Sequence, residues 1–146
     1  MKIAVASDHA GCALKERLAD HARRLGYAVD DLGPTNEDRV DYPDYAARVA
    51  AKVASGEAER GVLVCGSGVG VAMTANRFKG VRAVNAVMEV QARLARQHNA
   101  ANVLCLGQRL TAPELATSIL DVFMETGFEG GRHAGRVEKL EQFGSE

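Results

Sequence analysis

The sequence predicts an α/β fold of three layers, α/β/α, in which helices cover both faces of a five-stranded parallel sheet. Short apolar runs rich in β-branched residues alternate with amphipathic helical segments along the chain. The strand-like runs are apolar at consecutive positions, which is typical of strands buried on both faces. With 146 residues and 47% hydrophobic content, the chain is long enough for a sizeable core. We therefore expect residues 1–146 to form a single domain.

The first half of the chain predicts one βαβ unit followed by a helix. Residues 2–7 form an apolar strand, residues 12–25 an amphipathic helix and residues 27–32 a second strand. Residues 42–54 again have helical periodicity. Pro43 lies in the first turn of that helix, where a missing N–H is harmless.

The second half of the chain repeats the alternation. Its predicted strands are 62–65, 81–87 and 103–106, and the helices that follow them are 73–78, 88–97 and 113–124. Thr111 is the expected N-cap of the last of these helices. From about residue 127 the chain is rich in glycine and charge, and helical character returns weakly at 136–143. This order of elements is Rossmann-like.

Composition and charge exclude several classes of function. The formal net charge is −1 and basic residues are interspersed with acidic ones, so the sequence predicts no nucleic-acid partner. No apolar run suits a signal peptide or a membrane span, and we expect a cytoplasmic protein with no membrane partner. The three cysteines form an odd set without a C-x-x-C pair, which argues against disulfides and structural zinc.

The most informative segment is residues 61–71, in which a strand ends in a thiol, a hydroxyl and alternating glycines. Glycines at this position predict a tight strand-to-helix turn whose amides hold an anion, and the positive end of a helix favours the thiolate form of Cys65. The structural alternative is a packed core thiol, as we expect for Cys105 and Cys12. The loop is neither a Walker loop nor a dinucleotide fingerprint, since no Gly-Lys-Ser/Thr follows and Val71 replaces the third glycine.

A second polar stretch follows the first strand and can face the same crevice. Asp8 has two interpretations of equal weight, a helix N-cap and a functional carboxylate. His9 beside it favours acid/base chemistry or contact with an anion. Arg109, just past the last predicted strand, could contribute to holding a phosphate.

Two further clusters are polar without an obvious structural need. His98 and Asn99 begin the segment that joins the fourth predicted helix to the fifth strand, and Asn102 is the expected left-handed turn residue after them. Arg132 and Arg136 lie four residues apart, so they share one face if this stretch is helical. A solvated charged face is the common meaning of such spacing, and a bidentate phosphate clamp is the functional alternative.

Taken together, these motifs resemble one known family along essentially the whole chain. The matching stretches are Asp8-His9-Ala10-Gly11, Asp41-Tyr42-Pro43, Cys65-Gly66-Ser67-Gly68-Val69-Gly70, Ala75-Asn76-Arg77, Gly80-Val81-Arg82-Ala83, Arg96-Gln97-His98-Asn99, Asn102-Val103-Leu104 and Gly130-Gly131-Arg132-His133 with Arg136. Their order is similar to that of the type B ribose-5-phosphate isomerases, which are grouped with the galactose-6-phosphate isomerase subunits.

The resemblance implies an aldose–ketose isomerase that acts on a sugar phosphate through an enediolate, without metal or other cofactor. It would make Cys65 the base that moves a proton between C1 and C2, with Ser67 assisting transfer between the two oxygens. It would also make the amides of the loop at Gly66, Gly68, Val69 and Gly70 the groups that stabilise the enediolate. His98, with or without Asp8, would open the ring, and Asn99 and Tyr42 would contact the substrate. The phosphate would be bound by His9, Arg109, Arg132 and Arg136.

The resemblance also implies a homodimer, or a tetramer of dimers, in which the neighbouring subunit supplies His98 and Asn99. We expect the segment from about residue 127 to help dimerisation and phosphate binding. One branch of the family uses a glutamate where this chain has Val71, which leaves the thiol as the expected base and Glu89 as the other carboxylate of interest.

The substrate and the class of function have alternatives at this stage. Ala100 and the stretch 85–91 depart from the common pattern near the expected sugar end. Ribose 5-phosphate and ribulose 5-phosphate are the first choice, and allose 6-phosphate, galactose 6-phosphate or a tetrose phosphate are alternatives. A sugar-phosphate-binding module without activity is the alternative of a different class, because fold alone does not determine function.

Overall fold

The computed structural model describes residues 1–144, so the last two residues of the predicted domain, 145–146, lie outside it. One five-stranded, all-parallel sheet forms its centre, in the strand order β2-β1-β3-β5-β4. The strands are β1 (Lys2–Ser7), β2 (Ala28–Asp31), β3 (Arg60–Cys65), β4 (Ala83–Asn85) and β5 (Val103–Gly107). The predicted fold class is confirmed.

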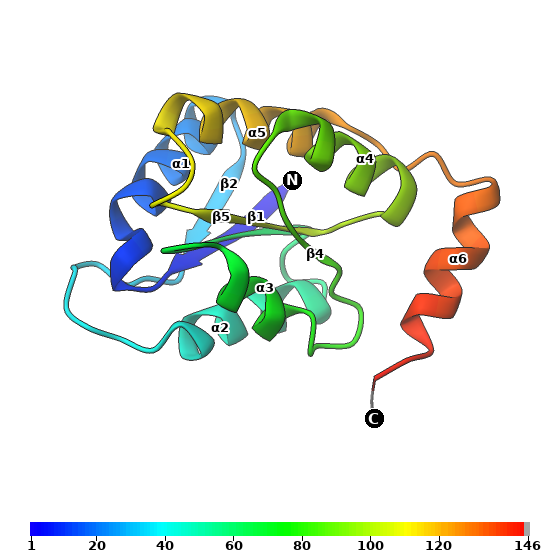
Figure 1. Ribbon diagram of the computed structural model, residues 1–146, viewed down its shortest axis with the longest axis horizontal. Helices are drawn as coiled ribbons and strands as arrows, with labels where there is room; N and C mark the ends of the chain where they lie inside the picture. Colours follow the sequence, from blue (N-terminus) through cyan, green and yellow to red (C-terminus); the bar gives the residue numbers. More distant parts are fainter. Residues whose placement is uncertain (145–146) are drawn as a thin grey trace.

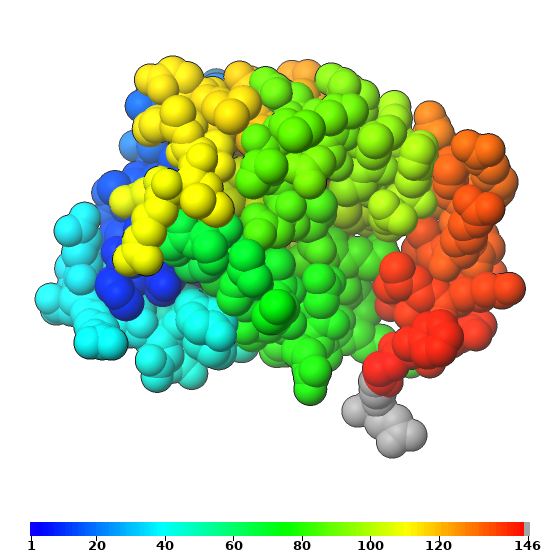
Figure 2. Space-filling view, in the orientation of Figure 1, coloured from blue at the N-terminus to red at the C-terminus, as the bar shows by residue number. Residues whose placement is uncertain are grey.

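Helices cover both faces of this sheet (Figure 1). On one face lie α1 (Cys12–Arg24), α4 (Glu89–Asn99) and α5 (Pro113–Glu125), and on the other lie α2 (Tyr42–Ala54) and α3 (Val69–Ala75). A short 3₁₀ turn, η1 (His9–Gly11), joins β1 to α1. The last helix, α6 (Arg132–Glu141), lies at one end of the molecule, where its Glu141 pairs with Arg82 (Figures 1 and 2). Among residues 1–144, no helix has both the length and the apolar character needed to cross a bilayer.

The central strands bury both of their faces, as their unbroken apolar sequence predicts. In β1, Ile3 and Val5 pack with α1, α4 and α5, whereas Ala4 and Ala6 pack with α2 and α3. Leu63 and Cys65 of β3 alternate in the same way and belong to the α2/α3 side. Cys65 therefore reaches the carboxyl edge of the sheet on the side where α3 begins.

One buried ion pair ties α1 to the edge strand β2. Lys15 is only 1% exposed, and its Nζ donates to Oδ1 and Oδ2 of Asp31 at 2.9 and 2.8 Å. The Asp31 Oδ1 atom also accepts the Gly33 amide at 2.9 Å. An ammonium this deeply buried is tolerated because the carboxylate satisfies it.

Most predicted elements match within a few residues, and three differ more. α3 begins at Val69 rather than at residue 73, because Gly68 adopts the left-handed φ of +81° and turns the chain directly from strand to helix. β4 has three residues instead of the predicted seven. α6 begins at Arg132 rather than at residue 136.

The predicted N-cap of α5 is wrong. Ala112 occupies the cap position and no side chain caps the helix, which Pro113 opens. Thr111 is buried instead, and among the described residues its Oγ1 has no hydrogen-bond partner. Proline at the first helical position removes one of the N–H groups that a cap serves, so the helix needs Thr111 less.

Candidate active site

A cleft of about 520 Å³ lies at the carboxyl edge of the sheet, where the three central strands end together. Parallel register sets this arrangement, since Ser7 pairs with Val64 and Cys65 with Gly107. In parallel α/β sheets this edge is the usual place of a ligand site. The lining residues are Asp8, His9, Ala10, Tyr42, Cys65, Gly66, Ser67, Val69, Gly70, Met73, Arg109 and Leu110.

The loop after β3 orients the thiol and the hydroxyl through its own amides. The Gly68 amide donates to Sγ of Cys65 at 3.1 Å, and the Val69 amide donates to Oγ of Ser67 at 3.2 Å. Cys65 is 5% exposed, so its sulfur is held at the floor of the cleft. Two of the four amides predicted to face an anion, those of Gly68 and Val69, are thus already engaged within the loop.

Neighbouring segments clamp this loop from two sides. The amides of Gln108 and Arg109 donate to the carbonyl oxygens of Cys65 and Gly66 at 2.9 and 3.0 Å. The Arg109 guanidinium lies against Gly66, 3.1 to 3.4 Å from where a Cβ would be. On the other side, a Cβ on Gly68 would lie 2.5 Å from Oδ1 of Asn85. A larger residue at Gly68 would displace the loop, whereas one at Gly66 would first displace the Arg109 guanidinium.

Two further predicted residues, Asp8 and His9, line the cleft together with the thiol. Asp8 caps η1, because its Oδ1 accepts the amides of Ala10 and Gly11 at 3.0 and 3.1 Å. The structural interpretation of Asp8 is therefore confirmed, and its carboxylate also lines the cleft. The His9 ring is held by Val40, whose amide nitrogen and carbonyl oxygen lie 3.2 and 3.1 Å from Nδ1.

Tyr42, the first residue of α2, forms one wall of the cleft. Its ring lies so close to Gly70 that a Cβ there would be 2.5 Å from the nearest ring carbon. Gly70 lies inside α3, and a glycine is needed there because the Tyr42 ring leaves no room for a side chain.

The other predicted site residues, His98, Asn99, Arg132 and Arg136, do not reach this cleft within one chain. A helix that follows a strand in a parallel sheet runs back antiparallel to it, so the C-terminal end of α4 with His98 and Asn99 lies at the amino edge. Arg132 and Arg136 lie on α6, beside that end (Figure 1). The structure therefore separates these two arginines from His9 and Arg109, with which the sequence grouped them.

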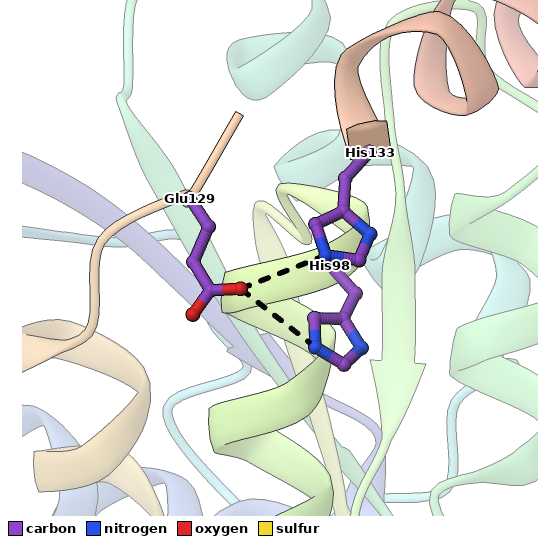
Figure 3. A group of neighbouring side chains, drawn as sticks. All are labelled: His98, Glu129 and His133. Atoms are coloured by element: carbon purple, nitrogen blue, oxygen red, sulfur yellow. Dashed lines mark ion pairs between the residues drawn. The ribbon is translucent and has the colours of Figure 1, made fainter. Parts of the chain in front are cut away.

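Near His98 the structure assembles a cluster that the sequence analysis missed (Figure 3). The rings of His98 and His133 stack with centroids 4.3 Å apart and an interplanar angle of 14°. Oε1 of Glu129 lies 3.9 Å from Nε2 of His98 and 3.6 Å from Nε2 of His133. Burial, the neighbouring His98 and Arg132 lower the pKa of His133, against the opposing effect of Glu129. In the sequence, the only indication of this cluster was His133, the residue that follows Arg132.

Asn102 is not the left-handed turn residue after α4; Ala100 is, with φ of +49°. Asn102 instead braces the chain, accepting the Arg82 amide at 2.7 Å and donating to the Gly80 carbonyl at 2.8 Å. Arg82 in turn donates from Nε to the carbonyls of Asn99 and Ala100, both at 3.1 Å, and pairs with Glu141 of α6. This network joins β4, α4 and α6 into one support for His98.

The other two thiols are core residues, as predicted. Cys105 is fully buried, which raises the pKa of its thiol. Cys12 is 3% exposed, and burial together with Glu16 raises its pKa as well. Cys65 is the cysteine that lines the cleft.

A cleft with a thiol and a hydroxyl on a glycine loop, flanked by an imidazole and a guanidinium, is that of an enzyme for a small anionic substrate. Comparison with known families agrees and is more specific. The model of the Ribose/Galactose Isomerase family matches residues 3–140, so this chain belongs to that family and is a sugar-phosphate isomerase.

Individual relatives cover almost the whole chain. Ribose-5-phosphate isomerase B of Escherichia coli is 45% identical over 139 residues, 95% of this chain and 93% of the relative. D-erythrulose-4-phosphate isomerase of Pectobacterium atrosepticum is 37% identical over 142 residues, 96% and 93% of the two chains.

Solved structures of the family have the same fold. Ribose-5-phosphate isomerase B of Clostridium thermocellum superposes with a TM-score of 0.96 at 44% identity, covering 97% of this chain and 96% of the other. That of Mycoplasma genitalium, solved with bound ribulose-5-phosphate, gives a TM-score of 0.93 at 45% identity, covering 97% and 94%.

Proposed function

We propose that this protein interconverts ribose 5-phosphate and ribulose 5-phosphate through an enediolate, without a metal ion or other cofactor in the catalytic step. The observation that carries the proposal is that the Cys65 thiol and the Ser67 hydroxyl, each held by an amide of one loop, line the same cleft. Relatives named for this reaction, and one solved with its ketose, support the choice of substrate.

Cys65 is the base in this mechanism. It takes the proton from C2 of the open-chain aldose and returns it to C1, while Ser67 passes a proton between the oxygens on C1 and C2. Negative charge develops on those oxygens, and the amides of the loop at Gly66 and Gly70 stabilise it. A fixed donor of this kind contributes roughly 3–4 kcal/mol to such a transition state.

The phosphate lies at the opposite end of the substrate from C1. His9 and Arg109 line the same cleft and supply an imidazole and a guanidinium for it. Tyr42 lines the part of the cleft that holds the sugar.

The remaining residues act from a second copy of the chain. His98 opens the furanose ring, with Asp8 of the cleft as its partner, and Asn99 contacts the sugar. Arg132 and Arg136 complete the phosphate site from the segment beyond residue 127. One chain holds these two groups at opposite edges of its sheet, and a homodimer joins them into one site.

Exposed apolar side chains suited to such a dimer lie on α4 and on the turn before it. Val87, Met88, Val90 and Leu94 are each 43 to 47% exposed, and Leu94 lies one helical turn before His98. Exposed apolar side chains of this kind are typical of an interface between subunits. A dimer, or a tetramer of dimers, would cover them. The three free thiols further favour a cytoplasmic location.

Other sugar phosphates remain alternatives, because one relative is named for erythrulose 4-phosphate. The stretch 85–91 and Ala100 differ from the usual pattern and would lie near the sugar end. Allose 6-phosphate, galactose 6-phosphate and tetrose phosphates are therefore included in the test.

The test is a panel of aldose phosphates of four to six carbons, followed by NMR for the ketose product. We expect ribose 5-phosphate to give the highest kcat/KM, and EDTA should not lower the rate. Cys65→Ala should abolish turnover and still bind ribose 5-phosphate, whereas the matched Cys12→Ala variant, whose thiol lies outside the cleft, should keep the rate. Full activity in Cys65→Ala would refute the mechanism, and binding without turnover in the wild type would indicate a binding module.

A further inference from the structure

We propose that His98, Glu129 and His133 form a binding site for one divalent transition-metal ion, with zinc as the best match, and that an ion bound there inhibits the isomerase. The metal site is argued from the three side chains alone. The inhibition rests on the proposed function, in which His98 opens the sugar ring.

Two of the three distances between the ligand atoms are already close to those that a metal requires. The three atoms are all within 4.8 Å of one another, and the two histidine nitrogens are 3.9 and 3.6 Å from Oε1 of Glu129. Ligands at zinc distances of about 2.1 Å in a tetrahedron lie about 3.4 Å apart. The two distances from Oε1 of Glu129 to the histidine nitrogens exceed this value by about half an ångström or less. Figure 3 shows both rings turned toward the same carboxylate oxygen.

Three separate segments hold these ligands in place. His98 lies in the last turn of α4, His133 in the first turn of α6, and Glu129 in the linker between α5 and α6. The Glu129 amide donates to the carbonyl of Gln97 at 3.1 Å, which fastens the linker to α4 next to His98. Because the backbone already holds the segments together, binding needs only side-chain rotations.

The donor set also suits the ion chemically. Two imidazoles and one carboxylate are a ligand set that zinc accepts, with a fourth position open to water. The Arg132 Nε, 3.5 Å from Nε2 of His133, must swing away from that nitrogen as the ion enters.

Occupation of the site removes the lone pair that His98 needs. An imidazole nitrogen bound to a metal neither accepts nor donates a proton, so the ring-opening step slows. Ribulose 5-phosphate has no ring to open, because its C5 oxygen carries the phosphate. Zinc should therefore slow the reaction of ribose 5-phosphate more than that of ribulose 5-phosphate.

Binding is tested first, without any measurement of activity. The full chain, freed of metal with EDTA and dialysed, is titrated with zinc by calorimetry and with cobalt by absorption spectroscopy. We expect one ion per chain and a cobalt spectrum without a thiolate charge-transfer band. Glu129→Gln and His133→Ala should each lose this binding. Cys65→Ala and His21→Ala, whose histidine pairs with Asp121 on another surface, should keep it.

Inhibition is tested second, on the same preparations. Zinc should lower the rate with ribose 5-phosphate, EDTA should restore it, and Glu129→Gln should be active and insensitive to zinc. Zinc binding that survives in both Glu129→Gln and His133→Ala would overturn the site, whatever the activity. If one ion binds as described but no sugar phosphate is isomerised, the site stands and the proposed function fails.

Discussion

Replacing Gly68 by alanine tests how the catalytic loop is held. Gly68 adopts φ of +81°, where an L-residue pays a strain of roughly 1–2 kcal/mol. The new Cβ would also lie 2.5 Å from Oδ1 of Asn85 and 3.0 Å from the carbonyl carbon of Leu106. Such overpacking costs about 1–3 kcal/mol more. We therefore expect Gly68→Ala to lower the free energy of unfolding by about 2–5 kcal/mol in total.

Gly26 provides a matched control on the surface. It has a similar φ of +94°, and apart from its chain neighbours no residue of 1–144 has an atom within 4 Å of its Cβ position. Gly26→Ala should cost only the backbone term of roughly 1–2 kcal/mol and leave activity unchanged. The two variants are compared by urea denaturation at one protein concentration, since association shifts apparent stability.

The same change should also damage the chemistry, because the Gly68 amide donates to Sγ of Cys65. A displacement of the loop by about 1 Å would reduce kcat by about 100-fold. In the double variant with Asn85→Ala, the closest of the clashes is removed, so part of the stability should return. If Gly68→Ala were as stable as Gly26→Ala and fully active, the argument from contact would be refuted.

Three other predictions follow from burial and charge. Lys15→Met strands the Asp31 carboxylate and should destabilise the protein by about 3 kcal/mol in urea denaturation. The pKa of His133 is lowered on folding, so the unfolded chain takes up a proton that the folded chain does not as the pH falls below 6.5. The free energy of unfolding should therefore decrease as the pH falls, and His133→Asn should flatten that part of the pH profile. Iodoacetamide should modify Cys65 before Cys105, whose burial raises its pKa, as measured by peptide mass spectrometry.

Each of these has a contrasting control. Lys52 pairs with Glu57 at 2.8 Å on the surface, and Lys52→Met should cost less than about 1 kcal/mol. An equal loss in the two lysine variants would contradict the role of burial. An unchanged pH profile in His133→Asn would contradict the lowered pKa. Equal labelling of the two thiols would contradict the placement of Cys65 in an open cleft.

The parts of the site that were predictable from sequence are those encoded locally. A strand that runs directly into Cys65-Gly66-Ser67-Gly68 can only turn sharply, and the structure has the thiol at that turn. Asp8 follows a strand and precedes a helix, which is where a capping carboxylate belongs, and it caps η1. Such features depend on residues within one or two turns of one another.

Other features depended on residues far apart in the chain. Thr111 looked like a cap, but its surroundings bury it. Asn102 looked like a turn residue, but Arg82 and Gly80 bind its side chain. The cluster of Glu129 and His133 with His98 forms only because the linker before α6 is fastened to α4. Periodicity and spacing carry no information about such partners.

By itself, the sequence determined the parallel α/β sheet, the glycine loop with its thiol, and the series of motifs that match one family. These follow from side-chain periodicity and local backbone freedom, which act over a few residues. Only the tertiary structure decided which residues meet. Because helices in a parallel sheet run back against the strands, Cys65 and His98 lie at opposite edges of one chain, and their side chains require a second copy to meet in the proposed site.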